Sequence, residues 1–269
     1  MSKSNKRKNP GCFIRLMTAA FTVILIFVLS SWAGKQLNRN ENNNEISLVG
    51  AQQQVNAYAE KNDIDVSEYP KELLELLARN SECERFVMEY PLKKDYDYKI
   101  DLSEYKRSKE VPLLIQWDQR WGYKSYGNNM LGISGCGPTC LSMVAMYLLN
   151  DTTMDPLWMA RFSEKNGYCV PGNGSSWELI SKGAKKLGLD VTEIPLDKNR
   201  IIENLSVHNP IICIMGPGSF TTSGHFIVLT GYEDGSVTVN DPNSYERSSK
   251  RWKLEDFMGE IRNLWVIRK

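Results

Sequence analysis

Histidine is scarce in this sequence, with only His208 and His225 among 269 residues. Cys-x-x-Cys pairs are absent, so no ligand set typical of zinc is present, and we expect neither a metal nor a cofactor. An excess of one charge is also lacking, because 33 basic and 32 acidic residues leave a formal net charge of +1. Without a basic excess, a nucleic-acid partner is not expected.

The positive charge that is present is concentrated at the N-terminus. Residues 1–12 form a basic tail, and residues 13–33 are apolar with a core, Leu16–Ala33, of 18 uncharged residues. As a helix this core spans about 27 Å, enough to cross the hydrocarbon layer. Because basic flanks stay cytoplasmic, we expect a single-pass signal anchor in the cell membrane with the C-terminal part outside. Ser31 and Ala33 also fit a cleavage site, so secretion after cleavage near Ala33 is the alternative.

Three further segments follow the apolar stretch. Residues 34–66 are polar and Asn-rich and then weakly amphipathic, which predicts a stalk with a weak helix. Residues 67–110 predict a small helical region and a charged linker, because Lys71–Asn80 carries leucines at helical spacing. Residues 111–269 differ from the charged linker in having apolar segments separated by turn residues, which predicts a compact domain long enough for one hydrophobic core.

Within the compact domain, helical patterns come before strand patterns. Apolar residues at helical spacing predict a central helix from about Cys136 through Leu149, and a later helix ends near Gly188. Runs rich in β-branched and aromatic residues predict strands at Val111–Gln116, Pro210–Met215, His225–Tyr232, Ser236–Asp241 and Asn263–Arg268. Helices followed by antiparallel strands predict an α+β fold with two lobes.

The densest chemical motif is SGCGPTC, at Ser134–Cys140. Glycines on both sides of Cys136, followed by proline and an apolar helix, place its sulfur at a helix N-terminus. Unpaired N–H groups and the helix dipole stabilise a thiolate there. The alternative is a small residue packed at a tight helix entrance. Cys140 lies one turn deeper, and we expect it to be a core residue.

A thiolate that acts as a nucleophile needs a proton-transfer partner. His208 comes just before Asn209-Pro210 at an expected helix end and has the context of an exposed loop residue. His225 begins an apolar strand after Ser223-Gly224, where a strand terminus can hold an imidazole at the edge of a cleft. A histidine at a strand start is more often structural, but Cys136 requires a base and His225 is the better placed.

A hairpin brings Asp241 near His225. A two-residue loop would pair Val228 with Asp241 and put the imidazole and the carboxylate on opposite faces. A three-residue loop, Glu233–Gly235, would pair Ile227 with Asp241 instead, and the two side chains would share a face. We predict the second register, in which the carboxylate orients the imidazole. Ordinary turn chemistry at Asp241 is the alternative.

An oxyanion formed during acyl transfer needs hydrogen-bond donors. The backbone N–H of Cys136 is one candidate, and a side-chain amide is the usual second. Gln116 is the predicted donor, at the end of the apolar run VPLLIQW, and Gln119 is the competitor.

The ordered motifs QWDQRWG, SGCGPTC, GHFIVLTGY and NDPNS resemble those of papain-like cysteine peptidases of the bacteriocin leader-processing type, in their stand-alone exported bacterial form. The resemblance covers roughly residues 111–269. It implies a papain-like fold of two lobes, with Cys136 as nucleophile, His225 as base and acid, Asp241 as orienting residue and Gln116 as oxyanion donor. We expect no attached transporter, so a double-glycine leader need not be the substrate.

These features predict a membrane-anchored extracytoplasmic cysteine peptidase that acts on a peptide or a cell-wall peptide through an acyl-enzyme. A transamidase with the same triad and a catalytically silent peptide-binding module are the alternatives. Five cysteines follow the apolar stretch, and this odd number leaves at least one thiol unpaired. No disulfide pairing is assigned.

Overall fold

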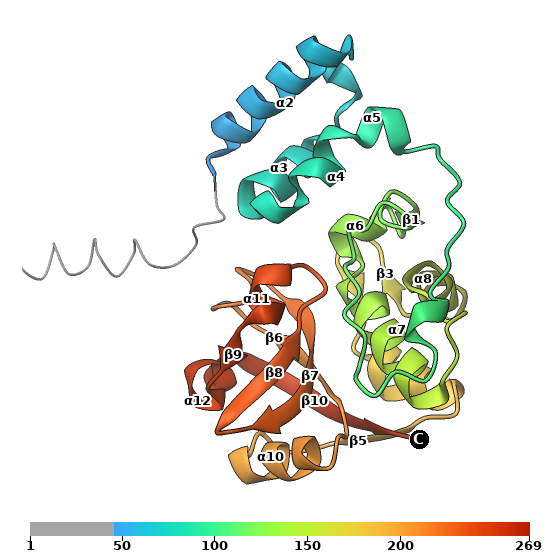
Figure 1. Cartoon of the computed structure of the whole chain (residues 1–269), viewed down its shortest axis with the longest axis vertical. Helices are drawn as coiled ribbons and strands as arrows, with labels where there is room; N and C mark the ends of the chain where they lie inside the picture. Colours follow the sequence, from blue (N-terminus) through green and yellow to red (C-terminus); the bar gives the residue numbers. More distant parts are fainter. Residues whose placement is uncertain (1–45) are drawn as a thin grey trace, which may run out of the picture. The chain divides into compact units, whose positions relative to one another are not determined.

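The computed structural model describes residues 46–269, and these lie in one compact unit (Figure 1). The predicted basic tail and signal anchor lie outside the described residues. Within residues 46–269, none of the helices has both the length and the apolar character needed to cross a bilayer.

The N-terminal part of this unit is a helical region, here defined as residues 46–94. Its helices are α2 (Leu48–Asn62), α3 (Lys71–Arg79), α4 (Glu84–Met88) and α5 (Tyr90–Lys93). The leucine stripe of α3 is buried and packs against α2 and α4. Ile115, Trp117 and Tyr123 from the following segment belong to the same buried cluster. The helical region therefore shares a hydrophobic core with the rest of the chain.

A set of helices and short hairpins follows. It contains β1 (Ser125–Tyr126), β2 (Asn129–Met130), α6 (Leu131–Ser134), α7 (Cys136–Leu149), α8 (Pro156–Lys165), β3 (Cys169–Val170), β4 (Gly174–Ser175), a π-helical turn (Leu179–Gly183) and α9 (Ala184–Lys186). The central helix is where the sequence predicts it. It is almost entirely buried, because α8 packs against one side and the sheet against another.

The last third forms a six-stranded antiparallel sheet with the strand order β5-β10-β6-β7-β8-β9. The strands are β5 (Asp190–Glu193), β6 (Ile211–Met215), β7 (His225–Glu233), β8 (Ser236–Asn240), β9 (Arg251–Trp252) and β10 (Ile261–Arg268). The sequence predicted four of them and missed β5 and β9, which are the short strands at the two edges of the sheet.

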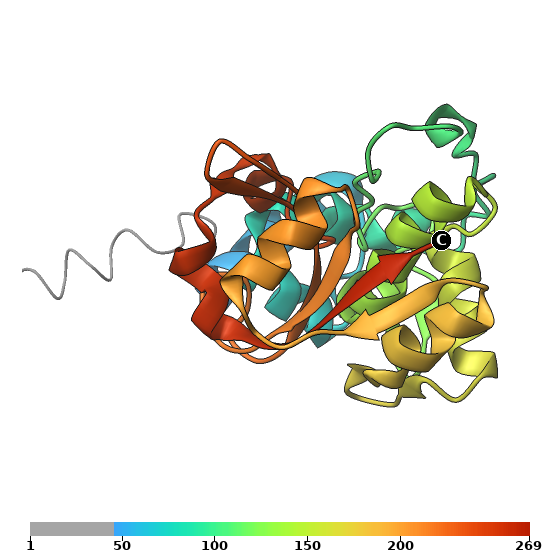
Figure 2. The same ribbon diagram turned by 90° about the horizontal axis from the view of Figure 1, so that it is seen from below.

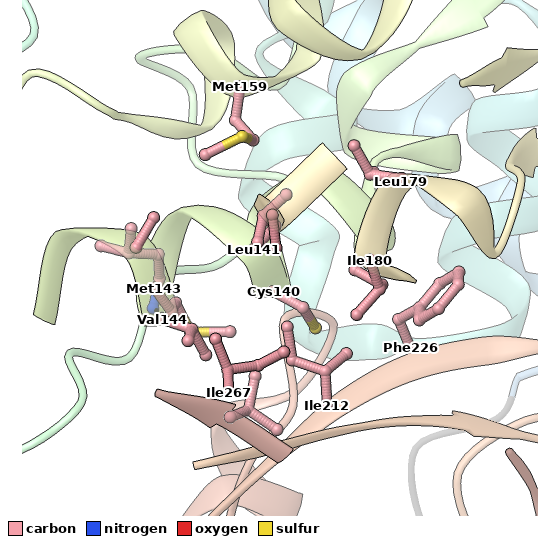
Figure 3. Packing of buried hydrophobic residues seen from close by; sticks show 14 of the residues in the cluster. Cys140, Leu141, Met143, Val144, Met159, Leu179, Ile180, Ile212, Phe226 and Ile267 are labelled. Atoms are coloured by element: carbon pink, nitrogen blue, oxygen red, sulfur yellow. Dashed lines mark hydrogen bonds between the residues drawn. The ribbon is translucent and has the colours of Figure 1, made fainter. Parts of the chain in front are cut away.

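Each face of the sheet carries its own core. Ile212 and Ile214 of β6 face α7, and Figure 3 shows Cys140 of α7 packed near Ile212. Cys213 and its neighbours at alternate positions face the other way, toward α10 (Lys198–Ser206) and α12 (Leu254–Phe257). In Figure 2, α10 lies across the sheet on this second side. The described part is therefore a mixed α/β fold, with helices first and an antiparallel sheet after them.

One predicted element is absent: Val111–Gln116 is extended but pairs with no strand of the described chain. Its backbone bonds elsewhere, since the N–H of Leu114 donates to the Met143 sulfur and the N–H of Gln116 donates to the Pro242 carbonyl at 2.7 Å. An apolar run of this length is equally compatible with an extended segment that lies in a core, so periodicity alone misassigned it.

Candidate active site

Cys136 is the first residue of α7, where the sequence predicts it. Gly135 precedes it, and no side chain caps the helix start. The next residue, Gly137, lies so close to Ser175 that a Cβ atom there would be 2.6 Å from the serine Oγ. Any larger residue at position 137 would force the β4 segment away from the helix start. The half-buried Cys136 thiol therefore lies at a helix N-terminus that is closely packed from one side.

His225 and Asp241 meet as predicted. The imidazole Nε2 lies 2.7 Å from Asp241 Oδ1, and both side chains are buried. The Cys136 thiol lies close enough to the same imidazole for each group to shift the pKa of the other. Since Nε2 is engaged by the carboxylate, Nδ1 remains for the sulfur. His225 therefore joins a thiol on one side to a carboxylate on the other, and the structure brings all three predicted side chains together.

The hairpin that produces this arrangement differs from the prediction at its tip. Asp234 and Gly235 have φ angles of 51° and 78°, and Glu233 pairs with Ser236 across them. The loop thus has two residues with positive φ, as type I′ turns require, so the predicted three-residue loop is wrong.

The register that the site needs arises further down the strand. A bulge between Leu229 and Gly231 adds Thr230 to β7, so that Val228 pairs with Asn240. This is the register that the three-residue loop would have produced. The extra residue therefore places the Asp241 carboxylate on the same face of the sheet as the His225 imidazole.

The charges of the three groups are coupled. Burial raises the pKa of the Cys136 thiol. The interaction with His225 and the backbone N–H groups of Phe226 and Gly137 lower it, and together they outweigh burial, so the pKa lies below its ordinary value. Burial lowers the pKa of His225, whereas Asp241 and the thiol raise it to about 9. The pKa of the thiol is therefore lower than that of the imidazolium, so the pair favours a thiolate beside an imidazolium over two neutral groups.

Arg247 is a member of the site that sequence analysis missed. It lies in α11 (Tyr245–Ser249), and its Nε is 2.5 Å from Asp241 Oδ2. Burial raises the pKa of the Asp241 carboxyl, but the charges and hydrogen bonds of His225 and Arg247 together lower it below its ordinary value. The spacing of six residues from Asp241 across a turn was the only sequence signal available for this pair.

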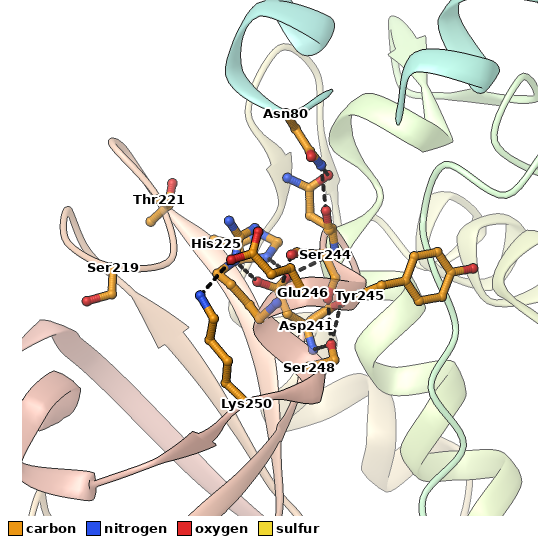
Figure 4. Close-up of polar contacts among 12 residues, drawn as sticks. Asn80, Ser219, Thr221, His225, Asp241, Ser244, Tyr245, Glu246, Ser248 and Lys250 are labelled. Carbon is orange, nitrogen blue, oxygen red and sulfur yellow. Dashed lines mark hydrogen bonds and ion pairs between the residues drawn. The ribbon is translucent and has the colours of Figure 1, made fainter. Parts of the chain in front are cut away.

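The loop after Asp241 is held from the helical region (Figure 4). The buried Asn80 donates from Nδ2 to the Asn243 carbonyl at 2.6 Å. The Glu82 carboxylate accepts hydrogen bonds from the Ser244 hydroxyl and from the backbone N–H groups of Tyr245 and Glu246. Two residues of the helical region therefore fix the start of α11, the helix that carries Arg247.

The two glutamine candidates are now distinguished by position. Gln119 donates to Glu89 at 2.7 Å, which directs it toward the helical region. Gln116 is buried, and its Nε2 donates to the carbonyls of Gly132 at 2.9 Å and Ile133 at 3.3 Å, while its Oε1 has no partner among the described residues. As an oxyanion donor, Gln116 would have to release the longer of these two bonds.

A cleft of about 610 Å³ lies beside Cys136 and His225. One wall comes from the helices and short hairpins, where Trp177 follows β4 and is 46% exposed. The other comes from the six-stranded sheet, where Met215 ends β6. Arg79 at the end of α3 and Arg262 in β10 also line it. The thiol and the imidazole are therefore accessible to a ligand of peptide size.

The other thiols and the second histidine lie in different settings. Cys140 and Cys213 are fully buried, and burial raises the pKa of each. Cys169 is half-buried and its pKa is also raised by burial. None of the five cysteines in residues 46–269 forms a disulfide. His208 is exposed after α10 and does not line the cleft.

A thiol, an imidazole and a buried carboxylate in this order are typical of cysteine-dependent acyl transfer. The chain belongs to the Peptidase_C39 like family, which matches residues 108–269. This confirms the resemblance stated from the motifs, and membership of the family indicates a cysteine peptidase. The helical region lies outside the matched residues.

Solved structures with similar folds have low identity to the chain. One is the peptidase domain of Streptococcus ComA, a bifunctional ABC transporter of a quorum-sensing pathway, with 20% identity, a TM-score of 0.43, and coverage of 59% of this chain and 98% of that one. A C39-like peptidase from Bacillus anthracis has 16% identity and a TM-score of 0.40, covering 64% and 98%. A double-glycine-motif protease of an AMS/PCAT transporter, solved with its leader peptide, has 21% identity and a TM-score of 0.38, covering 59% and 91%. The comparison with curated proteins gives no match.

Proposed function

We propose that the chain is a papain-like, membrane-anchored cysteine peptidase that hydrolyses an amide bond outside the cytoplasm. The observation that carries the proposal is the position of His225, which is hydrogen-bonded to the Asp241 carboxylate and lines the same cleft as the Cys136 thiol, whose pKa it lowers. A buried histidine with a purely structural role would need only the carboxylate as its partner. It would not need a neighbouring thiol whose pKa is lowered, as that of Cys136 is.

Each residue has a defined task in the proposed reaction. The Cys136 thiolate attacks the amide carbon, and the imidazolium of His225 gives its proton to the leaving amine as the C–N bond breaks. The resulting thioester is then attacked by water, which loses a proton to the neutral imidazole, and the thiolate leaves. Asp241 orients the imidazole throughout, and the backbone N–H of Cys136 with Gln116 are the oxyanion donors of the proposal.

The substrate class proposed is a peptide, with cell-wall peptides as a subset. A cleft of about 610 Å³ with walls from two parts of the domain accommodates several residues of an extended chain. A silent binding module would not need a thiol of lowered pKa, and this observation favours an enzyme. A transamidase with the same triad would need water to be kept from the thioester, and the experiment below separates it from the hydrolase.

The proposed location is the outer face of the cell membrane. It rests on the apolar residues 13–33 behind the basic residues 1–12, and on the stalk that would hold the domain away from the lipid. Release after cleavage near Ala33 would give the same domain in secreted form.

A peptide library digested by the full-length chain tests the proposed activity. New amine termini should appear with the natural protein and disappear with Cys136→Ala, whereas Cys140→Ala, the matched control one helical turn deeper, should retain them if it folds. Cleavage that persists in Cys136→Ala would refute the assignment. Acyl transfer to an added amine in place of hydrolysis would identify the transamidase instead.

A further inference from the structure

The cleft beside Cys136 has an unusual charge. Among the described residues that line it are two arginines, Arg79 and Arg262, and no aspartate or glutamate. Residues 46–269 as a whole contain 30 acidic and only 26 basic residues. A net negative unit therefore presents a cleft whose fixed side-chain charges are positive.

Neither of these two arginines forms an ion pair with a described residue. Exposed cations elsewhere in residues 46–269 often pair with carboxylates, as Lys71 does with Glu75 and Lys250 with Glu246. Within the same described range, neither Arg79 nor Arg262 has a carboxylate oxygen within 4.0 Å. Their guanidinium groups remain available to an anionic ligand.

The position of the Arg262 guanidinium depends on a glycine. A Cβ at Gly216 would be 2.2 Å from Arg262 Nε, so the guanidinium lies directly against the backbone at the end of β6. The nearby Glu260 is engaged elsewhere, because its carboxylate accepts hydrogen bonds from the N–H and the hydroxyl of Ser219, each at 2.8 Å. Arg262 is exposed beside the cleft, its Nη1 donates to the Gly259 carbonyl at 3.5 Å, and Glu260 does not neutralise it.

Arg79 is positioned by a different part of the chain. It is the last residue of α3 and is followed by the buried Asn80, which is bonded to the Asn243 carbonyl. This contact holds the end of α3 against the loop that follows Asp241. The helical region, which lies outside the residues that match the family, thus supplies one wall residue of the cleft.

We propose that Arg79 and Arg262 form a cationic subsite that binds a carboxylate of the peptide substrate. The proposal rests on the peptidase function proposed above and adds the chemical class of its substrate. Guanidinium groups bind carboxylates through paired N–H donors, and the geometry of the fork adds specificity to the charge. The carboxylate can belong to an Asp or Glu side chain or to the C-terminus of a short peptide.

Thiol-directed peptides in matched charged and neutral pairs test the subsite in the full-length chain. The probes are bromoacetyl-peptide amides with none, one or two Gly spacers before either Glu or Gln, plus the Gln peptides with a free C-terminal carboxylate. Rates of alkylation at Cys136 are measured by peptide mapping and divided by the iodoacetamide rate of the same variant. We expect at least one Glu probe or one free-acid probe to react about tenfold faster than its neutral partner. Which of the two does so identifies the source of the carboxylate.

Arg79→Gln and Arg262→Gln should each reduce this preference, and the double variant should bring the ratio close to one. Arg79→Lys should retain part of it, because the charge stays while the fork is lost. Arg85→Gln is the matched control, since Arg85 is an exposed arginine of α4 that pairs with Glu89 away from the cleft. The preference should also fall when salt is raised from about 50 mM to 500 mM.

The outcomes separate the two proposals. A fast iodoacetamide reaction at Cys136 with no preference for any carboxylate would overturn the subsite and leave the peptidase intact. A Cys136 thiol no more reactive than Cys169 would instead contradict the peptidase. In that case NMR titration of Cys136→Ser with acetylated Glu and Gln peptides still measures the preference without thiol chemistry, and equal affinities would reject the subsite.

Discussion

The Glu82 carboxylate, in the helical region, accepts a hydrogen bond from the hydroxyl of Ser244, three residues after Asp241. Its second oxygen accepts from the N–H groups of Tyr245 and Glu246, so one side chain satisfies three donors at the start of α11. This helix also carries Arg247 at its middle residue, and Arg247 is the ion-pair partner of Asp241. Glu82 is therefore a positioning residue for the carboxylate of the candidate triad.

Glu82→Ala should lower kcat about tenfold with little change in KM, because the substrate contacts remain while Asp241 loses its fixed position. The alkaline limb of the pH profile should also move to lower pH, which a purely structural loss would not cause. Glu82→Gln should restore part of the rate. Glu84→Ala, at an exposed position two residues on, is the control. Equal loss in both variants would contradict the positioning role.

The predicted triad can be dissected by substitution. His225→Ala should abolish turnover, since His225 is the base beside the thiol in the described residues. Asp241→Ala should lower turnover less severely, because the imidazole remains but loses its orientation. His208→Ala is the control and should be close to neutral, as His208 is exposed and away from the cleft. Steady-state turnover on any cleaved peptide provides the measurement. Loss in a folded His208→Ala would transfer the base role to that residue.

The pH dependence follows from the two coupled pKa values. Turnover should rise as the Cys136 thiol ionises below its ordinary pKa and fall as the His225 imidazolium loses its proton near pH 9. Asp241→Asn removes the charge that raises the pKa of His225, so the falling limb should move to lower pH. His225→Ala leaves burial as the largest effect on the thiol, so iodoacetamide alkylation of Cys136 should titrate at higher pH. Unchanged titration would favour a silent binding module.

The Arg247–Asp241 pair should contribute to stability. Asp241 is fully buried, so Arg247→Met removes one of the two cations that compensate its charge. We expect a loss of about 3 kcal/mol in the free energy of unfolding, measured with chemical denaturant. Arg251→Met is the matched control, because Arg251 pairs with Glu233 at an exposed position and its removal should cost under about 1 kcal/mol. An equal loss of unfolding free energy in both variants would show that the buried pair stabilises the fold no more than the exposed one.

The proposed topology has its own test. Protease added to intact cells should remove the domain that follows the apolar residues 13–33, because the basic residues 1–12 remain inside. Detection with an antibody to the domain provides the measurement, and a cytoplasmic protein serves as the control for cell integrity. Full protection of the domain in intact cells would contradict an outward orientation.

Much of the site could be predicted from the sequence because its chemistry is concentrated in short motifs. Glycines around Cys136 and the strand start at His225 fix local conformation, and a central helix and four strands follow from apolar periodicity. Glu82 and Arg247 could not be found in this way. Their roles depend on where α3 and α11 pack, and single charged residues on short helices have many possible partners.

The errors also have physical causes. Val111–Gln116 has the composition of a strand, yet its N–H groups are satisfied by Met143 and Pro242 rather than by a sheet. The register between His225 and Asp241 was right for a wrong reason, since a bulge can occur at many points of a strand and leaves no clear trace in composition.

Thr230 has no chemical part in the reaction, but the site depends on its presence. Its hydroxyl hydrogen-bonds that of Thr238 at 2.9 Å, which pins the extra residue in place. The strand pairing consequently differs by one residue on the two sides of Thr230: Glu233 pairs with Ser236 near the turn, and Val228 pairs with Asn240 near the site. In genetic terms, an in-frame loss of codon 230 would turn Asp241 to the opposite face of the sheet. Such a deletion would be as damaging as a missense change in the codon for Asp241 itself, although it alters no residue of the triad.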